Sequence, residues 1–244
     1  MNRIEMVKDM LKRKAVKNGA WLYLLQIFNT VVPLLTLPYI TRILGTKQYG
    51  IFSIAINIIG YYQVIVEYGF AMSATRKVAL SDKNTNSLSK TFSTVLFSRV
   101  FLLVVCFCIT VGYIFLNISQ ISQCFCLMIL MVTLLGNCIQ LNWLFQGMQQ
   151  MKYITIVSMI SRTITVVMTF IFVKSVDDLY LYCLLYAVSP VISGILGLIF
   201  ARNTFHIRLV KVGLNDIQNE LKSGWYVFTT QLSSKVFGAI GITF

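Results

Sequence analysis

The sequence is poor in charged residues, above all in acids and histidine. Charged side chains make up 12% of the 244 residues, hydrophobic residues make up 57%, and there are eight acids and one histidine. A soluble domain usually carries about twice that fraction of charge. The composition therefore predicts a protein of the lipid bilayer rather than a soluble domain.

The shortage of acids and histidine leaves little for catalysis or metal binding. His206 falls in a segment between apolar runs, and Asp177 and Asp178 fall together in another, which we interpret as a solvated loop. There is no H-E-x-x-H, G-x-S-x-G or phosphate-cradling motif, and the C-x-C pairs that begin at Cys106 and Cys124 lack zinc spacing. We predict that the chain is not an enzyme and uses no metal or cofactor.

Long apolar runs are abundant. Because a helix needs about 20 apolar residues to cross a bilayer, we predict an all-α integral membrane bundle with six complete spans and the start of a seventh near residue 224. The basic N-terminus precedes an apolar run too long for a cleavable signal, so we expect the first span to be retained. The six complete spans are predicted at residues 20–41, 50–70, 91–116, 121–143, 153–173 and 180–201.

Basic residues concentrate in alternate connections between these spans. Lys and Arg number six in residues 1–17, four in 71–90, one in 144–152 and four in 202–223. The intervening connections, 42–49, 117–120 and 174–179, hold two, none and one. Since cytoplasmic connections are enriched in Lys and Arg, we expect a multi-pass protein with a cytoplasmic N-terminus. The net charge of +13 is thus a topology signal, and nucleic acid is not expected as a partner.

Two of the basic segments, residues 1–17 and 202–223, carry apolar residues at helical spacing. In the second, the apolar residues are Ile207, Val210, Leu214, Ile217 and Leu221. Each segment is predicted to be either a helix on the inner leaflet or a helical connector packed on the bundle.

A short repeat divides the chain. KNGAWLYLLQIF from Lys17 resembles KSGWYVFTTQL from Lys222, and both stretches follow a basic segment and open an apolar run. Six predicted spans lie between them, which indicates a parallel repeat about an axis along the membrane normal. Residues 18–201 are then one six-helix lobe, 202–223 a connector, and 224–244 the truncated start of a second lobe.

Four charged residues fall inside the predicted spans: Glu67, Arg99, Arg162 and Lys235. Each costs about 2.5–3.5 kcal/mol on insertion scales, so each is a candidate functional residue. Arg162 lies near the middle of its span, whereas Arg99 is close enough to the inner end to reach the surface. Glu67 can pair with Arg76 or Arg99, but one acid cannot neutralise three cations. We therefore predict a water-filled cavity that attracts phosphate groups, which guanidinium binds with two hydrogen bonds.

Polar residues form stripes on several of the predicted spans. In lipid, such a stripe faces either a wet cavity or a neighbouring helix, to which it is joined by hydrogen bonds. The candidate cavity-lining residues are Gln26, Asn29, Asn57, Asn137, Thr155, Ser158 and Thr165.

Three stretches resemble the bacterial polysaccharide flippases, which export O-antigen and capsule repeat units and belong to the larger group that includes the MATE drug transporters. They are PYITRILGTKQYGIFSIA (38–55), WLFQGMQQMKYITI (143–156) and KSGWYVF (222–228). We expect the motif residues to be structural, with Arg42 and Gly45 shaping a turn and Gly147 ending a helix. The matched motif residues are Arg42, Gly45, Tyr49, Gly50, Trp143, Gln146 and Gly147.

The resemblance implies about twelve spans in two MATE-like lobes, of which this chain is the N-terminal one. It also implies translocation of an undecaprenyl-diphosphate-linked oligosaccharide across the cytoplasmic membrane for O-antigen or lipopolysaccharide biosynthesis. Partners would be that substrate, membrane lipid and other polysaccharide-assembly membrane proteins. Arg162, Arg99 and Lys235 would hold the diphosphate, and Glu67 is a candidate for ion coupling.

Three other functions remain open from the sequence. A MATE-type drug or metabolite antiporter that carries organic cations should have acids in its cavity. A membrane glycosyltransferase or polymerase should have a long outer loop, and the predicted outer loops are short. The third alternative is an inactive truncated fragment of a flippase.

Overall fold

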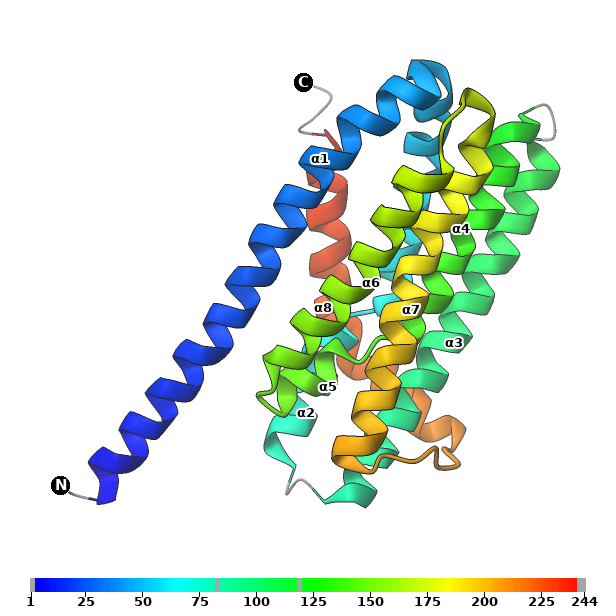
Figure 1. Cartoon of the computed structure of the whole chain (residues 1–244). Helices are drawn as coiled ribbons and strands as arrows, with labels where there is room; N and C mark the ends of the chain where they lie inside the picture. The colour runs from blue at the N-terminus through cyan, green and yellow to red at the C-terminus, as the bar shows by residue number, and fades with distance from the viewer. Residues whose placement is uncertain (1–2, 82–83, 118–119, 241–244) are drawn as a thin grey trace.

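The computed structural model describes residues 3–81, 84–117 and 120–240, with side chains described from residue 15 to 237 within those ranges. These residues form an all-α bundle, as the composition predicts (Figure 1). Its helices are α1 Arg3–Glu67, α2 Phe70–Leu80, α3 Thr85–Leu116, α4 Ile121–Ile139, α5 Asn142–Gly147, α6 Met151–Phe172, a 3-10 turn at Val176–Asp178, α7 Leu179–Phe205 and α8 Leu214–Ile240.

Helix α1 is folded back on itself at Gly45. Gly45 has φ 73° and ψ 167°, a combination that is essentially confined to glycine. The two parts, residues 3–44 (the first arm) and 46–67 (the second arm), run in opposite directions in Figure 1. The prediction that Gly45 shapes a turn is therefore confirmed. The second arm ends before residue 70 because Tyr68 and Gly69 both have positive φ, 42° and 79°.

The connections alternate between the two ends of the bundle. The N-terminus, α2, the α5–α6 junction and the α7–α8 link lie at one end, and the Gly45 fold, the α3–α4 link and the α6–α7 link lie at the other (Figure 1). We call the first of these the basic end, because its connections are those in which Lys and Arg concentrate.

Among the described residues, five helical segments are long and apolar enough to cross a membrane. The first contains both arms of α1 together with α2, so it includes two of the six predicted spans. Helix α8 is not among the five, so six spans and the opening of a seventh remain a prediction. The five segments are Ala15–Leu80, Thr85–Leu116, Ile121–Gly147, Met151–Phe172 and Val176–Phe205.

The link between α7 and α8 differs from the prediction. A helix over residues 207–213 is wrong: α7 ends at Phe205, and α8 begins only at Leu214 and runs without a break past residue 224. The physical reason is hydrogen bonding to α3, because the backbone N–H groups of Arg208 and Val210 donate to the hydroxyls of Ser89 and Ser93, at 3.1 and 2.8 Å. The non-helical link is thus held by side chains of α3, which lie far from it in the sequence. The spacing of its own apolar residues gives no information about them.

Close helix contacts hold the centre of the bundle together. A Cβ atom on Gly136 of α4 would lie 2.5 Å from backbone atoms of both Pro190 and Val191 on α7. The hydrophobic core has two parts, one around Leu127 and Leu130 of α4 and the other at the basic end around Trp143 of α5. Figure 1 shows α6 beside α7, with the first arm of α1 on the outer side of α6.

Candidate functional site

Arg162 of α6 reaches across to the first arm of α1. Its Nη1 donates a hydrogen bond of 2.5 Å to Oδ1 of Asn29, and the two residues are both half-buried. Asn29 is a neutral amide and therefore orients the guanidinium without cancelling its charge. Among the described residues the side-chain ion pairs are Lys77–Glu220 and Lys90–Asp216. Within that part of the chain, the charge of Arg162 is thus not neutralised by a carboxylate.

The polar stripe around Arg162 is mostly packed rather than open. Thr155 is fully buried and donates from Oγ1 to the carbonyl of Trp21, 2.9 Å away on the first arm. Thr165 is buried and donates within its own helix to the carbonyl of Arg162, at 3.1 Å. Ser158 is half-buried, and its carbonyl accepts from the Ser161 hydroxyl at 3.1 Å. Of the two roles predicted for the polar stripe, Thr155 therefore has that of a hydrogen bond between helices rather than that of lining a wet cavity.

Three further candidate lining residues lie on separate elements. Gln26 is exposed on the first arm, and its carbonyl accepts from the Thr30 hydroxyl at 3.0 Å. Asn57 is exposed on the second arm and donates from Nδ2 to the carbonyl of Ser53, at 2.9 Å. Asn137 is buried in α4. Of the predicted lining set, only Asn29 is hydrogen-bonded to the guanidinium of Arg162 in the described contacts.

Arg99 has a different environment from Arg162. It is 4% exposed, so the expectation that it reaches the inner surface is wrong. Its Nη1 donates to the carbonyls of Asn137 and Gln140, at 3.1 and 3.0 Å. These carbonyls lie at the C-terminus of α4, where a helix lacks intrahelical partners and where a cation is favoured by the helix dipole. Arg99 thus caps the C-terminus of α4, just before the break between α4 and α5.

Glu67 and Lys235 also lie apart from Arg162 in the described contacts. Glu67 accepts a hydrogen bond from Nε2 of Gln63 at 3.3 Å, and neither Arg76 nor Arg99 forms a salt bridge with it among the described residues. Lys235 of α8 is exposed, and its Nζ lies 3.2 Å from where a Cβ on Gly60 would be. The ammonium group therefore fits over a glycine on the second arm of α1.

The family-motif residues have structural positions. Gly147 is the last residue of α5, as predicted, and a Cβ there would lie 2.7 Å from the Cβ of Val78, so it lets α5 pack closely on α2. Trp143 is buried, and its carbonyl accepts from the Thr75 hydroxyl at 3.1 Å. Of the others, Arg42 is exposed, and the half-buried ones are Tyr49, Gly50 and Gln146.

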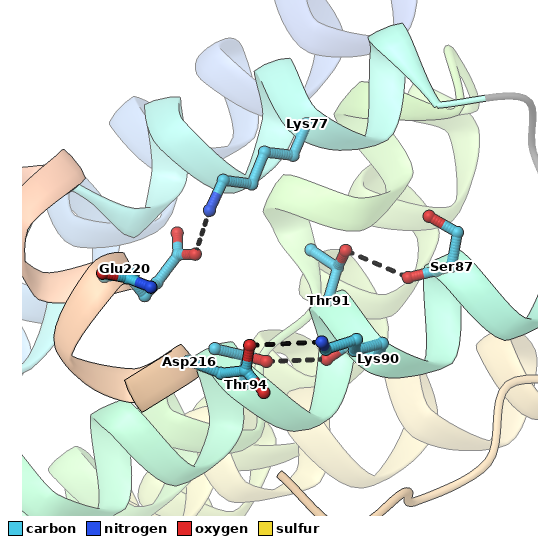
Figure 2. Close-up of a pocket in the computed structure, with 8 residues that line it drawn as sticks. Lys77, Ser87, Lys90, Thr91, Thr94, Asp216 and Glu220 are labelled. Atoms are coloured by element: carbon cyan, nitrogen blue, oxygen red, sulfur yellow. Dashed lines mark hydrogen bonds and ion pairs between the residues drawn. The ribbon is translucent and has the colours of Figure 1, made fainter. Parts of the chain in front are cut away.

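The sequence reasoning missed a charged cluster at the basic end. Lys77 of α2, Lys90 of α3, and Asp216 and Glu220 of α8 surround a cavity of about 190 Å³ (Figure 2). The available signal was the spacing of Asp216 and Glu220, which are four residues apart on a helical stripe and therefore share a face. The partners could not be found, because they come from two other helices.

The helices and the buried polar contacts define a multi-pass membrane protein whose charge is carried mainly by cations. A family model of polysaccharide biosynthesis proteins matches residues 15–242, and the chain belongs to that family. The resemblance found in its motifs is thereby confirmed.

Two curated relatives carry the same name, "Putative O-antigen transporter". The protein from Escherichia coli (strain K12) is 30% identical over 212 residues, which cover 87% of this chain and 51% of that protein. The protein from Shigella dysenteriae is 28% identical over 224 residues, 91% of this chain and 55% of that protein. The chain thus spans about half the length of the curated relatives it matches. No solved structure gives a significant match.

Proposed function

We propose that this chain forms one helical lobe of a transporter for a lipid-linked oligosaccharide of surface polysaccharide biosynthesis. The cargo is an undecaprenyl-diphosphate-linked repeat unit, which moves from the inner to the outer leaflet of the cytoplasmic membrane. Family membership and the names of the relatives support O-antigen transport as the general function. The concentration of Lys and Arg at the basic end supports a cytoplasmic N-terminus.

Arg162 is the observation that carries this proposal. A diphosphate is the part of such a cargo that hydrocarbon excludes, because burying a charge without a partner is very costly. An arginine has five N–H donors, and the hydrogen bond to Asn29 uses one of them. The guanidinium is thus held at a fixed position with donors left for a phosphate, and its charge is complementary to the cargo. Lys235, exposed against Gly60, is a second candidate contact on another helix.

A MATE-type antiporter of organic cations is the second candidate, and the charges disfavour it. Such a cargo calls for carboxylates in the membrane interior, where this chain has Glu67 against the three cations Arg99, Arg162 and Lys235. The names of the curated relatives also favour the polysaccharide reading.

The test is Arg162→Ala, introduced at the gene's own locus so that any further part of the protein is retained. Removing one partner of a charged contact costs about 2–5 kcal/mol, so we expect surface polysaccharide to fall about tenfold or more at an unchanged protein level. Arg162→Lys keeps the charge and should retain part of the activity, and Arg42→Ala, at an exposed arginine beside the Gly45 fold, is the matched control. Undiminished surface polysaccharide in Arg162→Ala would remove the proposed role.

A further inference from the structure

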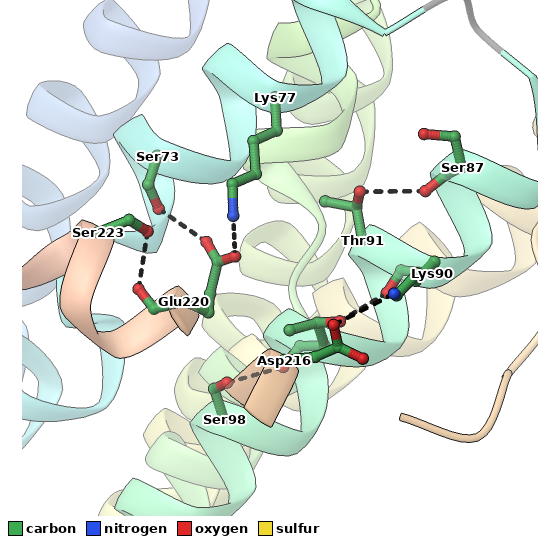
Figure 3. Close-up of polar contacts among 10 residues, drawn as sticks. Ser73, Lys77, Ser87, Lys90, Thr91, Ser98, Asp216, Glu220 and Ser223 are labelled. Carbon is green, nitrogen blue, oxygen red and sulfur yellow. Dashed lines mark hydrogen bonds and ion pairs between the residues drawn. The ribbon is translucent and has the colours of Figure 1, made fainter. Parts of the chain in front are cut away.

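Glu220 of α8 is a buried carboxylate that is held entirely by α2. Its side chain is 3% exposed, and Oε2 forms an ion pair with Nζ of Lys77 (Figure 3). Its other oxygen, Oε1, accepts a hydrogen bond of 3.2 Å from the hydroxyl of Ser73. Both oxygens of Glu220 are therefore satisfied by residues one helical turn apart on the same helix.

A second ion pair lies one turn earlier on α8. Oδ1 of Asp216 is 3.1 Å from Nζ of Lys90 on α3, and these side chains are 37% and 60% exposed. Asp216 and Glu220 share a face of α8, so one helix is tied to two others at the same end of the bundle. Between the two pairs lies the cavity of about 190 Å³, which is polar and large enough to hold water (Figure 2).

The energetics of the two pairs suit a reversible contact. An exposed ion pair contributes about 0–1 kcal/mol, so the Lys90–Asp216 pair adds little to the stability of the contact between α8 and α3. In the Lys77–Glu220 pair the carboxylate is buried, while the lysine side chain is 46% exposed. The dehydration of the carboxylate therefore offsets much of the attraction, although removing the partner of a buried charge is destabilising. Opening returns the carboxylate of Glu220 to water. The two ion pairs therefore add little net free energy to the closed arrangement.

The next turn of α8 rests directly on the junction between α1 and α2. A Cβ on Gly224 would lie 2.6 Å from the carbonyl oxygen of Tyr68, and a Cβ on Gly69 would lie 2.6 Å from the Cβ of Val227. The ring of Tyr68 stacks on Phe228 with centroids 4.6 Å apart. Tyr68 and Gly69 are also the two residues whose positive φ separates the second arm from α2. Movement of α8 therefore reaches the backbone at which α1 ends.

We infer that Lys77, Lys90, Asp216 and Glu220 form a latch between α8 and the α2–α3 pair, which opens and closes while the protein works. Closed, the latch covers Thr94 at the base of the cavity and holds α8 on the α1–α2 junction. Open, it frees α8 and admits water to the buried face of α3. The latch itself is a property of the fold, and its part in a transport cycle rests on the proposed function.

Access to Thr94 reports the state of the latch. Thr94 is buried on α3, lines the cavity, and donates only to the carbonyl of Lys90 in its own helix, so Thr94→Cys is a mild change. We would make it in a Cys108→Ser background, because Cys108 is an exposed native thiol. The measurement is the rate at which a maleimide labels Thr94→Cys in whole cells.

Breaking the latch should speed this labelling. With Glu220→Lys we expect labelling about tenfold faster, which corresponds to about 1.4 kcal/mol in favour of the open arrangement. The double variant Lys77→Glu with Glu220→Lys should restore slow labelling. The matched control is Lys211→Glu, which reverses an exposed charge at the same end outside the latch, and it should label slowly. Equal rates in all variants, or a double variant no slower than Glu220→Lys, would overturn the latch.

A second comparison tests whether the latch moves during transport. Labelling of Thr94→Cys should change about tenfold, again about 1.4 kcal/mol, between cells that make the lipid-linked oligosaccharide and cells blocked in its synthesis. An unchanged rate would contradict movement in the cycle. The two proposals fail separately, since Arg162→Ala tests the cargo without touching the latch, and the charge swap tests the latch without assuming the cargo.

Discussion

Arg162 and Asn29 are 133 residues apart in the chain, and a single hydrogen bond of 2.5 Å joins their side chains. The bond ties α6 to the first arm of α1 and holds a guanidinium beside a neutral partner. A carboxylate at the position of Asn29 would keep the geometry and cancel the charge. The choice of an amide there is therefore what leaves Arg162 available to an anion.

Asn29→Asp should strongly reduce transport without harming the fold. The new carboxylate neutralises Arg162, so we expect surface polysaccharide to fall about tenfold or more, in keeping with the cost of about 2–5 kcal/mol for losing a charged contact. The thermal midpoint of the purified protein in detergent should be unchanged or higher. Asn29→Leu is the companion variant, because it removes the acceptor and leaves the charge. Wild-type transport by Asn29→Asp would show that the charge of Arg162 is not needed.

Arg99→Met should act on stability rather than on transport. It removes a donor from the carbonyls of Asn137 and Gln140, whose hydrogen bonds to Arg99 are buried and half-buried, respectively. An unsatisfied buried group costs about 1–3 kcal/mol. We expect a lower midpoint of thermal unfolding in detergent, with transport per folded molecule preserved. Arg202→Met, at an exposed arginine in the last turn of α7, is the control. If Arg99→Met lost transport at normal stability, Arg99 would belong with Arg162 after all.

Gly136→Val should disrupt the contact between α4 and α7. The first added carbon alone would meet the backbone of Pro190 at 2.5 Å, and overpacking a tight contact costs about 1–3 kcal/mol. The fraction of protein that stays folded after heating in detergent should fall. Gly112→Ala on α3 is a matched comparison, because nothing lies within 4 Å of its added carbon. A stable Gly136→Val protein would mean that α4 and α7 can move apart freely.

Gly45→Ala should weaken the fold between the two arms of α1. No steric clash is involved, since nothing lies within 4 Å of the added carbon, but φ is 73°. Holding alanine in that conformation costs about 1–3 kcal/mol, which should appear as a lower unfolding midpoint. Gly50→Ala, five residues on within regular helix and equally open, should be neutral or stabilising. Equal effects of the two substitutions would mean that the backbone at Gly45 is not the constraint.

Much of the fold was predictable because lipid imposes a simple pattern. Helices must satisfy their own backbone groups in hydrocarbon, so long apolar runs with few charges identified the helical regions, and Lys and Arg counts grouped their connections. The turn at Gly45 and the helix end at Gly147 followed from short motifs. The link at 207–213 was mispredicted, because its apolar spacing suggested a helix while Ser89 and Ser93 of α3 supply its hydrogen bonds.

The candidate site could be predicted only in part. The composition of the spans was enough to select Arg99, Arg162 and Lys235, since each is a cation where charge is costly. It could not separate them, because Arg99 and Arg162 differ only in their neighbours: the carbonyls of α4 in one case and the amide of Asn29 in the other. The ion pair between Lys77 and Glu220 could not be predicted either, since the two residues are 143 positions apart in the chain.

The sequence alone determined that this is an all-helical membrane protein, which connections share an end, and which residues carry charge into the apolar interior. Those properties follow from local composition, because hydrocarbon acts on each segment separately. The tertiary structure decided the partner of each charge. Arg99 donates to the carbonyls at the end of α4, Glu220 pairs with Lys77, and Arg162 donates to the neutral amide of Asn29. Such distinctions depend on groups from distant helices meeting within hydrogen-bond distance, and only the packing of the whole bundle brings them together.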